Sequence, residues 1–273
     1  MGDMRTPSVS VLTIAGSDSG GGAGIQADLK TFAAHGVHGL SAISALTAQH
    51  TRGVSAVYVP DTGFLRAQID ACFEDFDIGA VKIGMLASAG VVEAVADALA
   101  FHAPPIIVLD PVMVATSAAK LLEDDALEAL RRRLLPMAGL VTPNIPEAEL
   151  LLGHPIDGPG TAETALSELI EMLGVRAVLL KGGHLDEGDN AVVDRYRDAA
   201  TKAEFRNERL DVAAHGTGCS LASAIAANLC LGLPVRSACE AAIDYVHRAL
   251  RSGYRPGRGE VLVLDHFGAA RAR

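Results

Sequence analysis

Short apolar runs alternate with longer amphipathic stretches along most of the chain. Strands that end at Gly, Asp or Pro are predicted for S-V-S-V-L-T-I-A-G, A-V-K-I-G, P-I-I-V-L-D, L-V-T-P and A-V-L-L-K-G-G, and a further strand for V-S-A-V-Y-V. The helical spacing of apolar residues predicts helices over 24–36, 62–73, 87–100, 123–135, 145–152 and 161–173. This alternation predicts a largely parallel sheet that is covered by helices on both faces.

The pattern changes after Lys181. Two segments, N-A-V-V-D-R-Y-R-D and K-A-E-F-R-N-E-R-L, predict a hairpin of half-exposed antiparallel strands, and two helices follow over 218–231 and 235–251. The chain contains no repeat, no low-complexity tract and no Pro/Ser-rich linker. We therefore expect one domain over 1–273, with 1–8 as a flexible N-terminal extension.

Composition narrows the classes of partner. The 273 residues are 49% hydrophobic and 21% charged, which is enough apolar material for a large core. A net charge of −10 argues against a nucleic-acid partner, although backbone N–H groups can bind an anionic small substrate whatever the net charge. The four cysteines form no C-x-x-C pair, which disfavours a disulfide framework or a zinc site. Without a signal-like or membrane-spanning run, we expect a cytoplasmic protein that has no membrane partner.

Chemistry is expected in the loops after the strands, because ligands of open α/β sheets bind outside the carboxyl ends of the strands. The first loop, A-G-S-D-S-G-G-G-A-G-I-Q-A-D, is rich enough in glycine for backbone to approach a ligand closely. Its partial G-x-G-x-x-G lacks the acidic residue of a dinucleotide site, and no G-K-[ST] follows the glycines. Asp28, early in the next helix, is either a solvated helix residue or an acceptor for a substrate hydroxyl or amine.

Two further residues after apolar segments have two interpretations each. Gln49 either presents a donor and an acceptor to the edge of a heterocycle or lies in a surface turn. Met85, in K-I-G-M-L, either lines an apolar pocket for a flat ring or fills the core. The local sequence leaves both pairs of alternatives open.

Oxygen-bearing side chains follow two other strands. Asp110 ends V-L-D, and Asn144 and Glu147 lie at the turn into a helix. These three side chains at adjacent strand ends suit Mg²⁺ near phosphate oxygens, held mostly through water. Asn144 and Glu147 also match a helix capping box, which is compatible with that role. Lys181, which is followed by two glycines, is either a nucleotide contact or part of a strand-ending turn.

The stretch H-G-T-G-C-S, which starts at His215, precedes an apolar helical run. Gly216, Thr217, Gly218 and Cys219 place free N–H groups and a hydroxyl at a helix N-terminus, a setting that favours anions. A thiol in that first turn is expected to have a lowered pKa and to act as a proton acceptor or nucleophile. The alternative is a small buried side chain, and a metal site would lack ligands.

In this order, these segments resemble the ribokinase-like superfamily, and closely its hydroxymethylpyrimidine/phosphomethylpyrimidine kinases of thiamine biosynthesis. The resemblance runs from Leu12 to Ala226. Its segments are L-T-I-A-G-S-D-S-G-G-G-A-G-I-Q-A-D-L-K-T, A-L-T-A-Q-H-T, V-K-I-G-M-L, V-L-D-P-V-M-V-A-T-S, L-V-T-P-N-I-P-E-A-E-L-L, V-L-L-K-G-G-H and H-G-T-G-C-S-L-A-S-A-I-A. It implies a three-layer sandwich with a mostly parallel central sheet. It also implies phosphoryl transfer from ATP to the 5-hydroxymethyl group of an aminopyrimidine, and then to its monophosphate.

The resemblance also implies roles for particular residues on the substrate side. Asp28, Gln49 and Met85 would hold the pyrimidine, with Gly16 and Val112 beside it.

On the phosphate side, the resemblance implies that Asp110 and Glu147 organise Mg²⁺, with Asn144 near the phosphates. Lys181 and Thr217 would lie on the ATP side, and a monovalent cation is a further expected cofactor. Gly216 to Cys219, including Gly218, would form the anion hole. Cys219 would stand where the sugar kinases of the superfamily have an aspartate general base.

Two segments depart from the family pattern, namely T-S-A-A-K at 116–120 and G-R-G-E-V-L-V-L-D-H-F near the end. The first puts the closing of a flexible cover in doubt, and the second puts tail contacts in doubt. A pyridoxine/pyridoxal kinase, or an enzyme with both activities, is the nearest rival. A nucleotide-dependent oxidoreductase and a non-enzymatic pyrimidine-binding protein are more distant rivals. Family members are commonly dimers, so a homodimer is expected.

Overall fold

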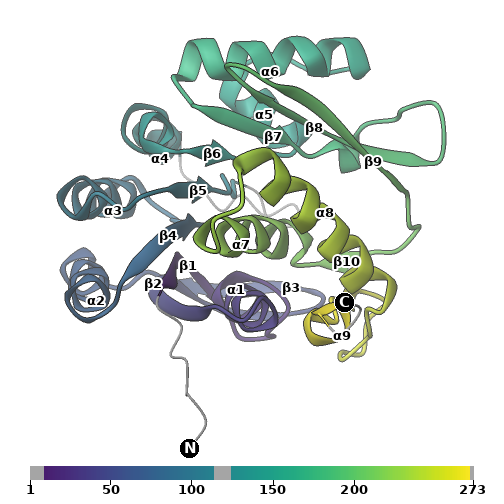
Figure 1. Ribbon diagram of the computed structural model, residues 1–273. Helices are drawn as coiled ribbons and strands as arrows, with labels where there is room; N and C mark the ends of the chain where they lie inside the picture. Colours follow the sequence, from purple (N-terminus) through teal and green to yellow (C-terminus); the bar gives the residue numbers. More distant parts are fainter. Residues whose placement is uncertain (1–8, 114–123, 271–273) are drawn as a thin grey trace, which may run out of the picture.

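The computed structural model describes residues 9–113 and 124–270. Its centre is a nine-stranded sheet in the order β3-β2-β1-β4-β5-β6-β7-β8-β9 (Figure 1). The strands from β2 to β7 in this order are parallel, whereas β3 at one edge and the β8–β9 hairpin at the other are antiparallel. The strands are β1 (Ser10–Asp18), β2 (His38–His50), β3 (Gly53–Tyr58), β4 (Ile78–Ile83), β5 (Ile107–Leu109), β6 (Leu140–Val141), β7 (Ala177–Leu180), β8 (Ala191–Asp198) and β9 (Lys202–Glu208). A separate parallel pair consists of β10 (Ala214–His215) and β11 (Leu262–Val263).

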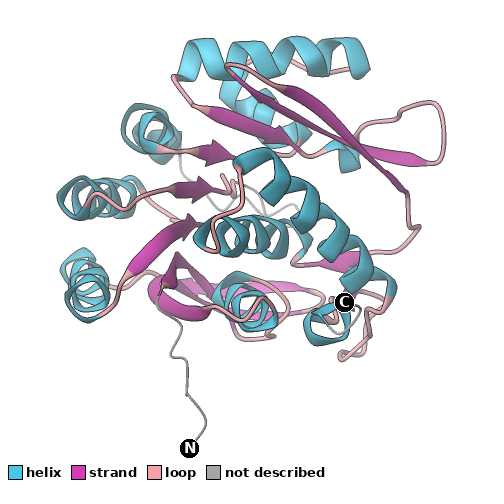
Figure 2. Cartoon of the chain, in the orientation of Figure 1, coloured by secondary structure: helices cyan, strands magenta, loops and turns pink. Residues whose placement is uncertain are grey.

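Helices cover both faces of this sheet, and Figure 2 shows the strands as one layer among them. One face packs against α2 (Thr62–Asp75), α3 (Ala89–His102), α4 (Asp124–Ala129), α5 (Ile145–Leu152) and α6 (Pro159–Leu173). The other face packs against α1 (Gly24–Ala34), α7 (Thr217–Cys230), α8 (Val235–Arg251) and α9 (His266–Ala270). Short turns of other helix types complete the chain: η1 (Leu130–Leu134), η2 (Leu135–Met137) and η3 (Gly182–His184).

The alternation of side chains along β1 explains the two cores. Leu12 and Ile14 join the core under α2 and α3, whereas Val11 joins the core under α1 and α7. All three side chains are fully buried, as expected for the central strand of a sheet covered on both faces.

The direction of strand addition reverses at β1. The chain first places β2 on one side of β1 and then returns to place β4 on the other side. Loops at the carboxyl ends of β1 and β4 therefore diverge, and a crevice forms between them. This point of the sheet is where the functional residues should gather.

The element pattern expected from the sequence is confirmed over most of the described chain, with one strong difference. The helix expected over 123–135 is α4 followed by η1, a π-helical turn, and then by the 3₁₀ turn η2. Pro136 lies within η2 and cannot donate an α-helical hydrogen bond, so a regular helix ends before it. Strand β2, the pair β10–β11 and helix α9 were not anticipated.

Some expectations are not decided by the structure. Residues 1–8, expected as an extension, and residues 116–120, the atypical loop, lie outside the described residues. The single-domain assignment stays a prediction. Within the described ranges, no helix is both long enough and apolar enough to cross a membrane.

Gly182 is required by packing. An ideal Cβ at Gly182 would lie 2.0 Å from the carbonyl oxygen of Val193 in β8, whereas one at Gly183 would meet no atom within 4 Å. We expect Gly182→Ala to lower the free energy of unfolding by about 1–3 kcal/mol, because strand backbone cannot yield as a side chain can. Gly183→Ala is the matched control, with an expected change within about 0.5 kcal/mol. Urea denaturation measures both, and equal effects would contradict this account.

Candidate active site

A cavity of about 730 Å³ lies at the carboxyl ends of the central strands. It is lined by the ends of β1, β2 and β4, by the loops after β5, β6 and β7, and by the N-terminus of α7. All of the predicted site residues except Asp28 lie on its wall. They are Gly16, Gln49, Met85, Asp110, Val112, Asn144, Glu147, Lys181, Gly216, Thr217, Gly218 and Cys219.

The glycine-rich loop after β1 is held in shape by Asp18. Its carboxylate accepts the backbone N–H groups of Gly20, Gly22 and Ala23 at 2.8–2.9 Å, and only 3% of the residue is exposed. Burial by itself raises the pKa of Asp18, but hydrogen bonds from His215 and from this backbone outweigh it and lower the pKa below its usual value. Asp18 is therefore ionised, and the loop is preorganised around its charge.

The two glycine loops touch each other through backbone. Gly216 has φ 84°, and an ideal Cβ there would lie 1.9 Å from the carbonyl oxygen of Gly22. Gly24 has φ 55°, and its Cβ would lie 2.4 Å from the carbonyl oxygen of Gly16. Only glycine fits at both positions, because the chain is left-handed and the approach is too close for a side chain. The glycine density that marked these loops in the sequence thus brings them together.

Asp28 does not line the cavity, so the expected direct contact with a ligand is wrong. The residue is 0% exposed, and its carboxylate accepts hydrogen bonds from Thr13 Oγ1 at 2.7 Å, Ser223 Oγ at 2.7 Å and Lys82 Nζ at 2.9 and 3.0 Å. Lys82 does line the cavity, although the side chain is otherwise buried. Asp28 therefore supports the site from behind through Lys82.

Lys82 is charged in spite of its burial. Burial alone would lower the pKa of its ammonium, but the negative charge of Asp28, with a smaller contribution from Asp110, raises it above the usual value. Lys82 is the first residue of the segment K-I-G-M-L, and no functional role was predicted for it from the sequence. The signal in the sequence that could have identified Lys82 was a lysine within an apolar strand. Gly84 leaves room for this lysine, because an ideal Cβ at Gly84 would lie 2.9 Å from Lys82 Nζ.

Apolar side chains line one part of the cavity. An ideal Cβ at Gly16 would lie 2.5 Å from Met85 Cε, so the glycine leaves room for the methionine side chain. Val112 lines the same cavity from the loop after β5. Gln49, at the end of β2, supplies an amide, and its side-chain nitrogen lies 2.8 Å from His215 Nε2. The apolar residues can contact the faces of a ring, and the Gln49 amide can form hydrogen bonds with its edge.

The other side is charged. Lys181 Nζ lies 2.8 Å from Asp110 Oδ1 and 3.6 Å from Glu147 Oε2. Burial lowers the pKa of Lys181, but Asp110 and Glu147 raise it well above its usual value, while burial raises the pKa of Glu147. The capping box of Asn144 and Glu147 is confirmed, with both of its hydrogen bonds present. It fixes Glu147 at the cavity wall.

Helix α7 points its N-terminus into the cavity. Its first intrahelical hydrogen bond runs from Ser220 N–H to the carbonyl oxygen of Gly216. The N–H groups of Thr217, Gly218 and Cys219 precede that bond and lie on the cavity wall, where they can bind an anion. An ideal Cβ at Gly218 would lie 3.3 Å from Lys181 Nζ, so the anion would be close to that ammonium.

The expected low pKa of Cys219 is wrong. Burial, the largest effect, and the negative charges of Asp28 and Asp110 together raise the pKa of its thiol to about 11, although the charge of Lys82 lowers it. A hydrogen bond from the Gly24 backbone also lowers the pKa, but burial has the larger effect. Cys219 is therefore a neutral thiol at neutral pH.

Comparison with known proteins places this geometry in a family. The family model described as phosphomethylpyrimidine kinase matches residues 18–264. This chain belongs to that family. The family resemblance and the ribokinase-like α/β fold expected from the sequence are confirmed, as is the assignment to the phosphotransferases.

The names of individual relatives agree with this family assignment. The chain is 48% identical to a hydroxymethylpyrimidine/phosphomethylpyrimidine kinase of Rhizobium meliloti over 94% of this chain and 96% of the relative. It is 48% identical to a thiamine biosynthesis bifunctional protein of Geobacter sulfurreducens, covering 93% of this chain but only 51% of that longer protein. Among solved structures, the ADP complex of Bacillus subtilis pyridoxal kinase has a TM-score of 0.88 at 32% identity, covering 97% of this chain and 99% of that chain.

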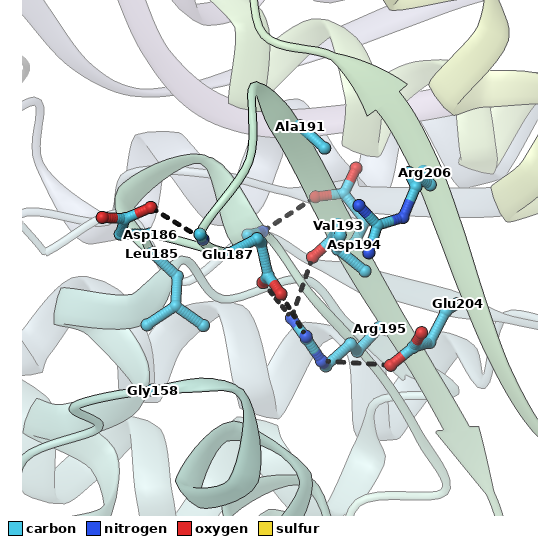
Figure 3. A network of polar contacts seen from close by, with 12 residues as sticks. Gly158, Leu185, Asp186, Glu187, Ala191, Val193, Asp194, Arg195, Glu204 and Arg206 are labelled. Atoms are coloured by element: carbon cyan, nitrogen blue, oxygen red, sulfur yellow. Dashed lines mark hydrogen bonds and ion pairs between the residues drawn. The ribbon is translucent and has the colours of Figure 1, made fainter.

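In this family member, sequence reasoning missed a wall of the cavity that comes from the β8–β9 hairpin. Asp194 lines the cavity and accepts the N–H of Gly182 at 2.8 Å, and burial raises its pKa to about 6. Behind it, Arg195 binds both carboxylate oxygens of Glu187 at 2.7 and 2.9 Å (Figure 3). The pair ties the loop after β7 to the sheet. The alternation of apolar and polar residues predicts a hairpin, but it does not predict which face of the hairpin lines a ligand cavity.

The Lys82–Asp28 pair generates a stability test. We expect Lys82→Met to lower the free energy of unfolding by about 3–5 kcal/mol, because the carboxylate of Asp28 would stay buried without its cation. Lys202→Met is the matched control, since Lys202 pairs with Glu163 at the surface and should contribute at most about 1 kcal/mol. Urea denaturation of both variants measures this, and a Lys82→Met change as small as the control would refute a strong buried pair.

Proposed function

We propose that the chain transfers the γ-phosphoryl group of ATP to the hydroxymethyl group of 4-amino-5-hydroxymethyl-2-methylpyrimidine, and then phosphorylates the resulting monophosphate. In the first step the substrate oxygen bonds to the γ-phosphorus, the bond to the β,γ-bridging oxygen breaks with ADP as the leaving group, and the hydroxyl proton passes to the Cys219 thiolate. The observation that carries the proposal is that one cavity is lined both by the apolar side chains of Met85 and Val112 and by a helix N-terminus beside Lys181. Family membership and the names of the relatives support it.

The ring is proposed to lie at the end formed by Gly16, Met85 and Val112, with its polar edge against Gln49. This end supplies apolar contact from two sides and one amide, which suits a small flat heterocycle. The hydroxymethyl group would then point toward α7, where the phosphoryl group must arrive.

The nucleotide phosphates are proposed to lie between the first turn of α7 and Lys181. Thr217 and Gly218 contribute N–H groups there, and Lys181 contributes a charge that its two carboxylate neighbours maintain. Such groups stabilise the charge on the transferring phosphoryl group. The adenosine would extend along the wall at Asp194, where the β8–β9 hairpin completes the cavity.

Mg²⁺ is proposed to be held by Asp110 and Glu147, mostly through water, and to neutralise phosphate charge when bound. The donor set fits a hydrated ion, because Lys181 already occupies Asp110 Oδ1 and leaves too few protein oxygens for a full coordination shell. Asn144 would then act near the phosphates through its position at the start of α5. The expected monovalent cation stays a prediction.

Cys219 is proposed as the proton acceptor only in its thiolate form. Its pKa of about 11 makes that form a small fraction at neutral pH. Phosphoryl transfer makes a modest demand on a base, so a small fraction suffices if the phosphate site is well arranged. The N–H groups of the same turn are in place whatever the protonation of sulfur.

Pyridoxal is the second candidate substrate, because the pyridoxal kinase of Bacillus subtilis shares this fold over nearly its whole length. Its lower identity, 32% against 48% for the pyrimidine kinase relative, favours the pyrimidine. A chain with both activities remains within this proposal.

A homodimer in the cytoplasm is also proposed. The edge strand β3 and the neighbouring part of β2 expose Leu46, Val57, Tyr58 and Val59, of which Tyr58 is 65% exposed. An unpaired strand edge with apolar side chains suits burial against a second copy of the chain.

The substrate assignment is tested by measuring ATP consumption and product mass with the free pyrimidine, its monophosphate and pyridoxal in parallel. We expect a higher kcat/KM for the pyrimidine than for pyridoxal, and phosphorylation of the monophosphate as well. If only pyridoxal is phosphorylated, the second candidate replaces the first. If no ring is phosphorylated, the kinase proposal fails.

The role of Cys219 is tested through pH. We expect Cys219→Ala to lower kcat by about 10²-fold. In the unchanged chain kcat should rise as pH increases toward 11, because a raised pKa keeps the thiol protonated below it and only the thiolate accepts a proton. Cys230→Ala, outside the cavity, is the control and should keep both kcat and this rise. A rise that persists in Cys219→Ala would assign the base to another group.

A further inference from the structure

A chain of three polar side chains crosses the ring end of the cavity. Asp18 comes from the end of β1, His215 from β10 directly before Gly216, and Gln49 from the end of β2. His215 Nε2 lies 2.8 Å from the side-chain nitrogen of Gln49 and 3.3 Å from Asp18 Oδ2. The imidazole lies close to the Gly22 backbone, because an ideal Cβ at Gly22 would lie 3.0 Å from its Cδ2.

Hydrogen-bond counting decides which end of the Gln49 amide faces His215. The two ends of an amide have nearly the same shape, so their assignment follows from their partners. The Thr47 hydroxyl has one hydrogen but faces two oxygen positions, the Ser17 carbonyl at 2.8 Å and Gln49 Oε1 at 3.0 Å. A carbonyl can only accept, so the hydrogen goes to Ser17. The amide end that faces Thr47 must then be the donor, its nitrogen.

This exchange places the Gln49 oxygen against His215 Nε2, which must then carry a proton. The charge of Asp18 gives the same result independently. Its ionised carboxylate lies 3.3 Å from Nε2 and attracts a bound proton, whereas it would repel a bare lone pair. Two separate observations, the hydroxyl of Thr47 and the carboxylate of Asp18, therefore agree on a protonated Nε2.

We propose that His215, with its Nε2 proton held by Asp18, is a positioning residue that fixes the Gln49 amide with its oxygen toward His215 and its nitrogen toward Thr47, and thereby selects the ring. This rests on the proposed function. A ligand then meets an acceptor on the His215 side and a donor on the Thr47 side. An aminopyrimidine has an amino donor next to a ring-nitrogen acceptor, the pattern that glutamine reads on adenine. The ring nitrogen of pyridoxal has no amino neighbour.

The test first removes the side-chain N–H donor at position 215 and then removes the Gln49 amide that it contacts. We expect His215→Leu to raise KM for the pyrimidine about tenfold, the effect of one lost polar contact, with KM for ATP unchanged. The preference for the pyrimidine over pyridoxal should fall by a similar factor. His215→Gln restores a side-chain N–H and should stay within about threefold of the unchanged chain. The surface variant His154→Leu is the control and should change neither KM.

A double-mutant cycle separates positioning from general damage. In a Gln49→Ala background, His215→Leu should raise KM by less than about twofold, because its effect passes through Gln49. An undiminished effect in that background would overturn the proposal.

A second measurement needs no substrate. The ¹⁵N spectrum of the ligand-free protein, assigned with His215→Gln, should show Nε2 of His215 bonded to hydrogen. An unprotonated Nε2 would overturn the proposal even if the chain proves to be a pyrimidine kinase. If the chain phosphorylates neither ring, the proposed function fails, and this spectrum still decides the orientation of Gln49.

Discussion

The buried ion pair between Lys82 and Asp28 is the interaction on which the site depends. Together with Thr13 and Ser223 it joins β1, α1, β4 and α7 at the point where strand order reverses. A charged pair in the core costs desolvation, and its several hydrogen bonds offset that cost only in one arrangement of the four elements. The pair therefore fixes where β4 ends relative to α7, and with it the distance between the ring end and the anion-binding turn.

The backbone completes what this pair begins. Gly216 lets the turn before α7 touch the loop after β1 at Gly22, where any side chain would collide, so the N-terminus of α7 faces the end of β1. The two cationic side chains on the cavity wall, Lys82 and Lys181, each form an ion pair with a carboxylate from another element. Positioning and charge are the main requirements of phosphoryl transfer, and this fold supplies both from rigid elements.

Periodicity and strand-end residues were sufficient to predict the parallel sheet, its two helical layers and most of the cavity wall. They failed where partners are distant in sequence. Asp28 occupies an early helical position that suits a ligand contact, but its partner Lys82 lies 54 residues further on, and only the fold brings them together. The prediction of a low pKa for Cys219 was wrong for a related reason, because burial and the charges of Asp28 and Asp110, which come from other elements, raise that pKa. The strands β10 and β11 are two residues each, too short for a periodic signal.

The most direct test of this account is a crystal structure of Cys219→Ala with a non-hydrolysable ATP analogue and the pyrimidine. The account predicts the ring between Met85 and Val112 with its edge on Gln49, and the γ-phosphate at the N–H groups of Thr217 and Gly218. Lys82 should remain paired with Asp28 beneath them. A ring bound elsewhere, or phosphates distant from the first turn of α7, would contradict it.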